Sequence, residues 1–359
     1  MSSKKNANQP ANNPPENTPP PASRFALLQK QIPAFWLLVL VALAIAIPSP
    51  FFLKQSSVKI QGPALSGDTC PPHPVRRNDR KLIRPLTAVE TPCLSTRLDP
   101  LRQEIAEVLA GFKNDGTVTE ASVYLEDLER NEWTAVNEKL QFQPSSLIKV
   151  PVMMAFCRMA ERTPGLLDAK IVAQLPSGTA PIPQTFGSKS ITLGQTYTLR
   201  ELLRYVISYS DNTATVITNN YVDIPTVERV FTDLGLSKFN FFDKSSFYMT
   251  AKDYAVFLRA IFNATYLSET DSEFAADLMS QCDFDKGFRQ VFPANARLFH
   301  KFGEGGDQNR GELHEAGVVY LNGSPYLLVV MTRGKSVQKL PKVIQSVAKA
   351  VNDALGSNT

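Results

Sequence analysis

The stretch FQPSSLIKVPVMMAF, residues 142–156, places two serines directly before a lysine at the start of an apolar run. Ser146 and Lys149 are three residues apart, and residues at that spacing are neighbours on one face of a helix. One interpretation is a helix start with a polar cap and a solvated lysine. The other is a serine nucleophile beside an amine that accepts its proton, and the rest of the chain must decide between them.

The composition limits the classes of function. The chain has 359 residues, of which 43% are hydrophobic and 20% charged, as in a globular protein. Its net charge of +4 is small and dispersed, which argues against a nucleic-acid partner. The three histidines and four cysteines show no metal-ligand spacing, so we expect no metal and no cofactor. Nothing in the sequence indicates an oligomeric state.

The cysteines separate into two pairs by context. Cys70 and Cys93 lie in a polar segment, and a bridge between them would suit an oxidising compartment. Cys157 and Cys282 lie in apolar or helical contexts, where buried thiols are expected, although a bridge is not excluded.

The N-terminal part of the chain divides into three segments. Residues 1–22 have almost nothing apolar to bury, and residues 1–31 are expected to be a disordered tail. Residues 32–53 carry no charge and can cross a bilayer core of about 30 Å as a helix, which predicts a transmembrane anchor. A cleaved signal peptide is the alternative, because Ala-Ile-Ala at 44–46 resembles a cleavage site. Residues 54–98 are expected to be a linker, with a basic cluster at 76–84.

Residues 99–359 have the periodicity of a folded domain. A helix at 99–112 is followed by two strand-like runs, a block of helices, three strands from about residue 296, and a final amphipathic helix. This order predicts an α/β (α+β) fold, in which an antiparallel sheet is assembled from both ends of the domain and carries the first and last helices on its face. The middle helices would form an all-α lobe, leaving a cleft between lobe and sheet.

A second motif, Ser210-Asp211-Asn212, directly follows the helix TLRELLRYVISY. Alone, this tripeptide is a capping or turn sequence. In an active site, Ser210 would relay a proton to the leaving group and Asn212 would hold a substrate amide carbonyl. Asp211 would then be structural and bond to the local backbone.

A third motif, Lys301-Phe302-Gly303, lies on the first of the later strands. Lys301 would bring a second positive charge that attracts a carboxylate and lowers the pKa of Lys149. Gly303 would let a ligand lie close to the strand backbone. Alone, K-x-G has almost no specificity, and an ordinary strand lysine is the alternative.

The three motifs together, in this order, resemble the signature set of class A β-lactamases and penicillin-binding proteins, from about Leu101 to the C-terminus. The segment TLRELLRYVISYSDNTATVI and the strand–hairpin–helix ending are similar too. The resemblance implies a β-lactamase/transpeptidase-like fold and a serine hydrolase that forms an acyl-enzyme with β-lactams or D-Ala-D-Ala cell-wall peptides. It also implies a single-pass protein of the cytoplasmic membrane with an extracytoplasmic catalytic domain.

The resemblance assigns a role to each motif residue. Ser146 would be the nucleophile, Lys149 its base and Ser210 the proton relay. The side chains of Asn212 and Lys301 would bind the substrate, and Gly303 would let it lie against the strand. The backbone N–H groups of Ser146 and Glu304 would form the oxyanion hole.

Two departures from the family pattern are evident. Phe302 replaces the Thr or Ser whose hydroxyl would bind the substrate carboxylate, so that role would pass to Lys301 or to Arg289, Arg310 or Arg333. The loop that carries the deacylating glutamate of class A enzymes looks deleted, and Asp243 is the only acid nearby. Deacylation is therefore expected to be slow.

Two other functions remain open from the sequence. The first is a binding or sensor domain that keeps the fold and has lost turnover, which the two departures favour and the intact motifs oppose. The second is a Ser-His-Asp hydrolase, for which His314 is the remaining candidate because His300 should face away from Lys301.

Overall fold

The computed structural model describes residues 76–77, 79–86, 92–181, 183–240, 243, 247–306 and 310–356. The expected tail and transmembrane anchor lie outside these residues. Within the described part of the chain, no helix is both long enough and apolar enough to cross a membrane.

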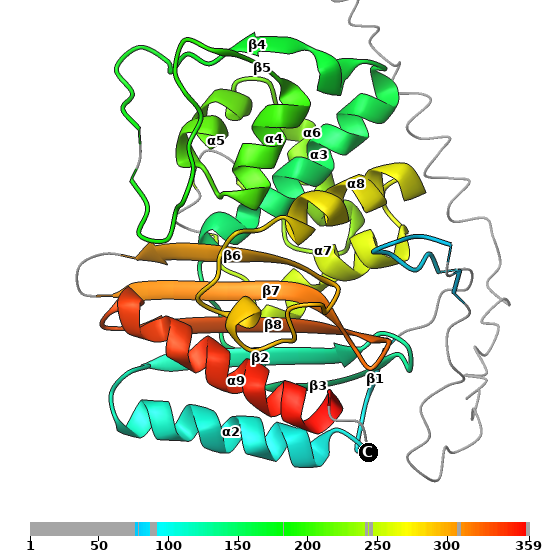
Figure 1. Ribbon diagram of the computed structural model, residues 1–359, viewed down its shortest axis with the longest axis vertical. Helices are drawn as coiled ribbons and strands as arrows, with labels where there is room; N and C mark the ends of the chain where they lie inside the picture. Colours follow the sequence, from blue (N-terminus) through cyan, green and yellow to red (C-terminus); the bar gives the residue numbers. More distant parts are fainter. Residues whose placement is uncertain are drawn as a thin grey trace, which may run out of the picture. The chain divides into compact units, whose positions relative to one another are not determined.

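A six-stranded sheet forms one layer of the domain, with strand order β1-β3-β2-β8-β7-β6 (Figure 1). Its strands are β1 (Cys93–Leu94), β2 (Glu120–Asp127), β3 (Glu132–Val136), β6 (Leu298–Gly306), β7 (Gly311–Leu321) and β8 (Ser324–Gly334). The pairs from β3 to β6 are antiparallel, whereas β1 runs parallel to β3. The predicted sheet, built from both ends of the domain, is confirmed apart from this parallel edge strand.

The first and last helices of the domain cover one face of the sheet, as predicted (Figure 1). They are α2 (Asp99–Asn114) and α9 (Leu340–Leu355). Apolar residues recur on one side of each helix, including Leu101 and Ile105 in α2 and Val343 and Val347 in α9, and all four are buried. Burial of these stripes against the sheet is the main stabilising contribution of this layer.

The other lobe is helical but is not all-α, which corrects the prediction. Its helices are α3 (Lys149–Arg162), α4 (Leu199–Ser208), α5 (Asn212–Asn219), α6 (Ile224–Asp233), α7 (Ala251–Asn263) and α8 (Glu269–Ser280). A small antiparallel pair, β4 (Lys170–Val172) and β5 (Thr196–Thr198), closes its far end. Those strands have only three residues each, too few to show a period of two in the sequence.

Short 3₁₀ helices complete the described elements: η1 (Ser145–Ile148), η2 (Leu166–Asp168), η4 (Phe288–Gln290) and η5 (Val337–Lys339). Capping boxes fix where two helices begin. Thr198 and Glu201 form one at α4, and Thr250 and Asp253 form another at α7.

Part of the expected linker belongs to the folded domain. Leu82 and Ile83 are buried, and their backbone N–H groups donate to the carboxylate of Glu273. The Tyr320 hydroxyl donates to Leu82 O at 3.0 Å. The guanidinium of Arg76 lies over the ring of Phe262, so the basic cluster is partly held against the domain rather than wholly solvated.

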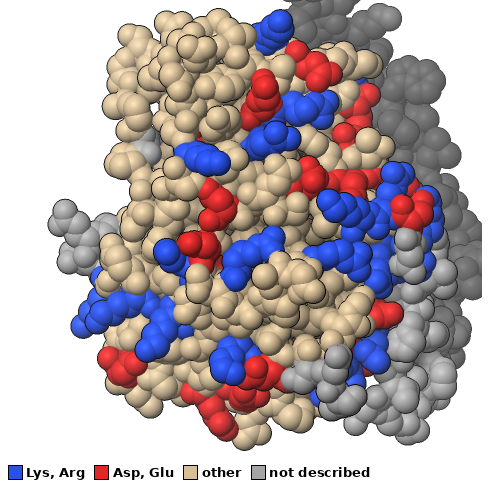
Figure 2. Space-filling model, in the orientation of Figure 1, with Lys and Arg blue, Asp and Glu red and all other residues tan. Residues whose placement is uncertain are grey.

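The cysteines behave as the sequence suggests where they are described. Cys157 and Cys282 are buried free thiols. Cys93 is disulfide-bonded, whereas Cys70, its expected partner, lies outside the described residues. On the face of the molecule shown in Figure 2, basic and acidic side chains are interspersed.

Candidate active site

The two residues of the first motif meet at the junction of η1 and α3. The backbone N–H of Lys149 donates to Ser146 O, the i→i+3 bond of a 3₁₀ turn, in which residues three apart are eclipsed. The carbonyl of Leu147 accepts a hydrogen bond of 3.1 Å from the buried Tyr254 hydroxyl, which fixes this turn in the lobe. Ser146 remains partly exposed, while Lys149 is only 4% exposed.

Lys149 joins the first motif to the second. Its Nζ donates to Ser210 O at 2.5 Å and to Asn212 Oδ1 at 2.8 Å, and it lies 3.3 Å from Ser210 Oγ. A buried ammonium with these partners is not the solvated surface charge of the first interpretation. The structure therefore brings Lys149, Ser210 and Asn212 together, and Ser146 lies in the turn directly before Lys149.

Two serines at this site have positive φ, namely Ser145 at 50° and Ser210 at 55°. Such angles are uncommon outside glycine and asparagine, and they store strain that is typically found at functional sites. Ser145 directly precedes Ser146, so the strained backbone of Ser145 determines the direction of the chain at the candidate nucleophile. The sequence contains no signal for this strain.

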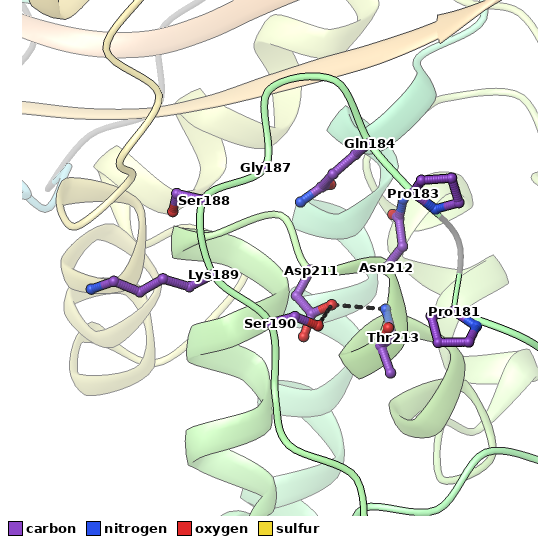
Figure 3. A pocket seen from close by; sticks show the side chains of 10 residues that line it. All are labelled: Pro181, Pro183, Gln184, Gly187, Ser188, Lys189, Ser190, Asp211, Asn212 and Thr213. Atoms are coloured by element: carbon purple, nitrogen blue, oxygen red, sulfur yellow. Dashed lines mark hydrogen bonds between the residues drawn. The ribbon is translucent and has the colours of Figure 1, made fainter.

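Asp211 has the structural role that the sequence predicts (Figure 3). Its carboxylate accepts hydrogen bonds from Thr213 N at 2.8 Å, from Ile191 N at 2.9 Å and from the Ser190 hydroxyl at 2.8 Å. It thereby caps α5 and holds residues 190–191 against the second motif. The neighbouring Ser210 and Asn212 side chains are left to face Lys149.

Strand β6 lies directly against η1. A Cβ placed on Gly303 would come within 2.9 Å of Leu147 N and of Pro144 O, and a Cβ on Gly305 would meet Ser145 Oγ. The glycine of the third motif is thus required by the protein's own backbone, rather than by the ligand that the sequence analysis expected there. This close contact between β6 and η1 places the backbone of Glu304, which lies between the two glycines, beside the turn that carries Ser146.

Replacing Gly303 by Ala is expected to push η1 away from β6, because backbone atoms cannot rotate aside as a side chain can. Overpacking of this kind costs about 1–3 kcal/mol of unfolding free energy. A displacement of about 1 Å at a reacting group lowers a rate by ~10²-fold. Thermal unfolding and the rate of the reaction at Ser146 would measure both effects. Gly111→Ala, with no atom near the new Cβ, is the control.

Lys301 is fully buried, and its Nζ donates to Phe302 O at 2.9 Å and lies 4.3 Å from the centre of the Phe302 ring. Burial lowers the pKa of Lys301 to about 8. These contacts do not by themselves bring the ammonium to Lys149. The mutual repulsion of the two amines stays a prediction.

Phe302 has a clear structural use. Its ring stacks on that of Phe284, with centroids 4.5 Å apart and planes at 18°. Phe284 in turn makes an edge contact with Phe186 at 5.5 Å. The residue that departs from the family motif is therefore part of an aromatic row that joins β6 to the segment before α4.

The arginines proposed for substrate carboxylate binding have protein partners. Arg289 donates to the carbonyls of Ser280 and Leu298. Arg333 pairs with Glu312 at 2.7 Å, and Arg310 lies 3.4 Å from the same carboxylate. The structure gives no support to Arg289 or Arg333 as the missing carboxylate ligand.

The two histidines in the described part of the chain, His300 and His314, lie in the sheet and have partners there. His300 Nδ1 lies 2.6 Å from Glu315 Oε1, and both side chains are buried. His314 Nε2 contacts Gln143 O at 2.9 Å, and its Nδ1 accepts from Thr332 N at 3.2 Å. A Ser-His-Asp site thus finds no support at His314.

Two hollows flank the second motif. One, of about 600 Å³, is lined by Asn212, by Glu304–Gly306 of β6 and by Lys335–Gln338. The other, of about 530 Å³, runs along residues 187–190 and Asp211–Thr213 (Figure 3). Pro183 and Asn212 line both. Asp243, the possible deacylation base, is exposed and is not among the lining residues of either hollow.

The side chain of Glu304 has a structural role that its sequence neighbourhood does not indicate. The carboxylate accepts a hydrogen bond from Phe186 N at 2.9 Å and another from Thr185 N. These contacts join residues more than a hundred positions apart, so no local pattern could have indicated them.

Comparison with known families agrees with this arrangement. Residues 100–355 match the family model described as the β-lactamase enzyme family. A comparison with curated proteins found no match.

Several solved structures have a similar fold. A β-lactamase from Chitinophaga pinensis is 24% identical, with a TM-score of 0.60, over 71% of this chain and 99% of its own. A mutant of PBP-A, solved as an acyl-enzyme complex with penicillin G, is 21% identical, with a TM-score of 0.61, over 74% and 98%. A class A β-lactamase from Mycobacterium abscessus is 20% identical, with a TM-score of 0.58, over 72% and 100%. At these identities the likeness concerns the fold.

Proposed function

Because this chain belongs to the β-lactamase enzyme family, we propose that it reacts through Ser146 with β-lactams or D-Ala-D-Ala cell-wall peptides and releases the acyl group slowly. The hydrogen bonds of the buried Lys149 to Ser210 and Asn212 carry this proposal. They place an amine and a second hydroxyl at the start of the helix that follows Ser146. PBP-A, a structure of similar fold, was solved as an acyl-enzyme with penicillin G.

In the proposed acylation step, Ser146 Oγ attacks the substrate carbonyl carbon while its proton passes to Lys149 Nζ. The oxyanion accepts hydrogen bonds from the backbone N–H groups of Ser146 and Glu304. The proton then moves through Ser210 to the leaving nitrogen as the C–N bond breaks, which leaves an ester on Ser146. Asn212 holds the substrate amide and Lys301 attracts its carboxylate.

Slow release follows from the absence of a glutamate in the segment between α6 and α7. A positioned general base contributes about 10²–10⁴-fold to a proton-transfer step. Without one, hydrolysis of the ester is expected to be slower by that order than in an enzyme that has the base. This behaviour is that of a penicillin-binding enzyme more than that of a resistance enzyme.

The proposal is tested by the intact mass of the full chain during incubation with benzylpenicillin. We expect the mass to increase by one penicillin and to remain increased after the free drug is removed. Rapid return to the original mass, together with turnover of a chromogenic cephalosporin, would show an efficient β-lactamase instead. No increase at any concentration would favour the catalytically degenerate binding domain, which the intact Lys149 contacts do not support.

The pH dependence of acylation gives a second test, because the pKa of Lys301 is lowered by burial to about 8. Above that pH the amine is neutral and no longer attracts a carboxylate, so the acylation rate should fall. Between pH 8 and 10.5 the unfolded chain holds the proton that the folded chain has lost, so this group's contribution to stability rises with pH. The expected fall in rate is therefore not an unfolding effect of Lys301.

Lys301→Arg is the matched variant for this profile, because a guanidinium stays charged throughout that range. Its rate is expected to be lower at neutral pH and to show no fall above pH 8. A flat wild-type profile from pH 7 to 10 would contradict a role of the Lys301 charge.

We also propose that residues 32–53 anchor the protein in the cytoplasmic membrane with the catalytic domain outside. The apolar, charge-free run supports an anchor, and the disulfide-bonded Cys93 favours an oxidising compartment. Membrane fractionation of the full chain, with protease added from the outside, tests both points. Recovery of a soluble protein lacking its first residues would instead indicate a cleaved signal peptide.

A further inference from the structure

Three buried polar side chains form a cluster that the proposed mechanism does not use. His300 lies on β6, Glu315 lies on β7, and Cys282 follows the end of α8. The imidazole and the carboxylate are fully buried, with His300 Nδ1 2.6 Å from Glu315 Oε1, and Cys282 is 5% exposed. A thiol, an imidazole and a carboxylate are thus enclosed beside the strand that carries the third motif.

Two glycines make room for this cluster. A Cβ placed on Gly317 would come within 2.6 Å of His300 Cβ, and a Cβ on Gly287 would overlap the Glu315 carboxylate. The same carboxylate accepts a hydrogen bond of 2.9 Å from Phe288 N. The backbone is therefore shaped around the His300 and Glu315 side chains, so the cluster is a built feature of the fold.

The cysteine and the histidine favour each other's charged forms. Burial alone would lower the pKa of His300, but the charges of Cys282 and Glu315 raise it to about 9. Burial alone would raise the pKa of the Cys282 thiol, but the charges of His300 and Lys301 lower it. His300 Nε2 is buried without a nitrogen or oxygen partner in the described residues, which leaves the thiolate as its counter-charge.

The chain directly after α8 is held between the second motif and β6. Asp283 N donates to Ser208 O at 3.1 Å, two positions before the second motif. The Phe284 ring stacks on that of Phe302, with centroids 4.5 Å apart. These contacts, on the two residues that follow Cys282, fix the thiol beside the strand of the third motif.

Lys301 follows His300 on β6 and responds to the charge of the cluster. Burial lowers the pKa of Lys301 to about 8, and the charge of Cys282 is the largest of the effects that oppose this fall. The other charged groups that raise the pKa of Lys301 are the carboxylates of Asp283, Glu304 and Glu315. The charge of Lys301 therefore depends on a side chain that lies outside the three motifs.

We propose that Cys282 is a positioning residue for the reaction: as a thiolate paired with the His300 imidazolium, it keeps the Lys301 ammonium charged for the substrate carboxylate. This inference rests on the proposed function, which assigns that carboxylate to Lys301. Glu315 holds the imidazole on its other side, so negative and positive groups alternate through the cluster. Cys282 touches no substrate and acts through Lys301.

The first measurement asks whether Cys282 is ionised. A thiolate absorbs ultraviolet light more strongly than a thiol, so the absorbance of the full chain is recorded as the pH is changed. We expect Cys157→Ser to keep a thiolate signal at neutral pH and Cys282→Ser to lack it. The reason is that burial raises the pKa of the Cys157 thiol, which stays protonated.

The second measurement is the pH profile of acylation by benzylpenicillin, given as the ratio of each variant to the wild type. Cys282→Ser keeps the shape of the side chain and removes its charge, so its rate should fall about 1 pH unit earlier, a loss of about fivefold at pH 8. Cys282→Asp restores a negative charge and should recover most of that loss, which a purely structural thiol would not allow. Cys157→Ser removes the other buried free thiol and should keep the ratio near one throughout.

A Lys301→Arg background tests whether the effect passes through Lys301. A guanidinium stays charged without help from a neighbouring anion. Cys282→Ser should therefore leave the pH profile of Lys301→Arg unchanged. A fall above neutral pH that Cys282→Ser still introduces in this background would contradict the inference.

The outcomes separate this inference from the proposed function. A folded Cys282→Ser variant with the wild-type profile, or a Cys282→Asp variant that behaves like Cys282→Ser, overturns the inference and leaves adduct formation intact. Absence of a thiolate signal at neutral pH in Cys157→Ser also overturns it, and this measurement holds even if the Cys282 variants do not fold. A wild type that forms no penicillin adduct overturns the proposed function and, with it, the role of the thiolate.

Discussion

Replacing Ser146 by Ala is expected to eliminate the penicillin adduct entirely. The ester in the proposed mechanism forms on Ser146 Oγ, an atom that alanine lacks. In serine hydrolases, removal of the nucleophile lowers kcat by about 10⁶-fold. Intact mass after a long incubation is the sensitive measurement, because a single persistent adduct accumulates even when the rate is very low.

The matched control is the neighbouring hydroxyl. Ser145 has a φ of 50°, which glycine accepts without strain, so Ser145→Gly removes a hydroxyl and keeps the turn. We expect this variant to form the adduct at a rate within about tenfold of the wild type, since the change removes no group from the mechanism. An adduct that survives Ser146→Ala and disappears in Ser145→Gly would show that Ser145, and not Ser146, is the nucleophile.

The fold was largely predictable because its signals are local and periodic. The apolar stripes of helices α2 and α9 and the alternation of the strands can be read from residues close together in the sequence. The order of these elements along the chain then predicts the two layers. The β4–β5 pair and the docked residues Leu82 and Ile83 were not predictable. Three-residue strands carry no period, and a short apolar pair in a basic segment looks like a linker until its partner, Glu273, is known.

The candidate site divides in the same way. Ser146, Lys149, Ser210 and Asn212 could be named because their motifs are short and their order along the chain is distinctive. That Lys149 contacts Ser210 could be seen only in the structure, because the two residues are 61 positions apart in the sequence. Phe302 illustrates the limit of motif reasoning. From the sequence it is the loss of a hydroxyl, and only the stack with Phe284 and Phe186 shows what the ring does.

Lys149→Met is expected to lower the acylation rate by about 10²–10⁴-fold, the usual contribution of a positioned proton acceptor. Methionine has a similar length and flexibility but cannot accept the Ser146 proton. The substitution removes the hydrogen bond that Lys149 Nζ donates to the buried Ser210 O. A buried acceptor that loses its donor costs about 1–3 kcal/mol of unfolding free energy. A lower melting temperature should therefore accompany the slower reaction, and non-covalent binding of benzylpenicillin measured at early times should persist.

Loss of a positive charge near the site must be separated from loss of the base, and Lys189→Met does this. Lys189 is exposed, lines the hollow beside Asp211, and has its ammonium 4.8 Å from the Tyr209 ring centre. Its replacement by Met removes the same charge as Lys149→Met but leaves the contacts of Ser210 unchanged. Its acylation rate should stay within a few-fold of the wild type, because an exposed charge is well screened. If Lys149→Met reacts as fast as Lys189→Met, the amine of residue 149 takes no proton from Ser146, and activation of the nucleophile must come from another group.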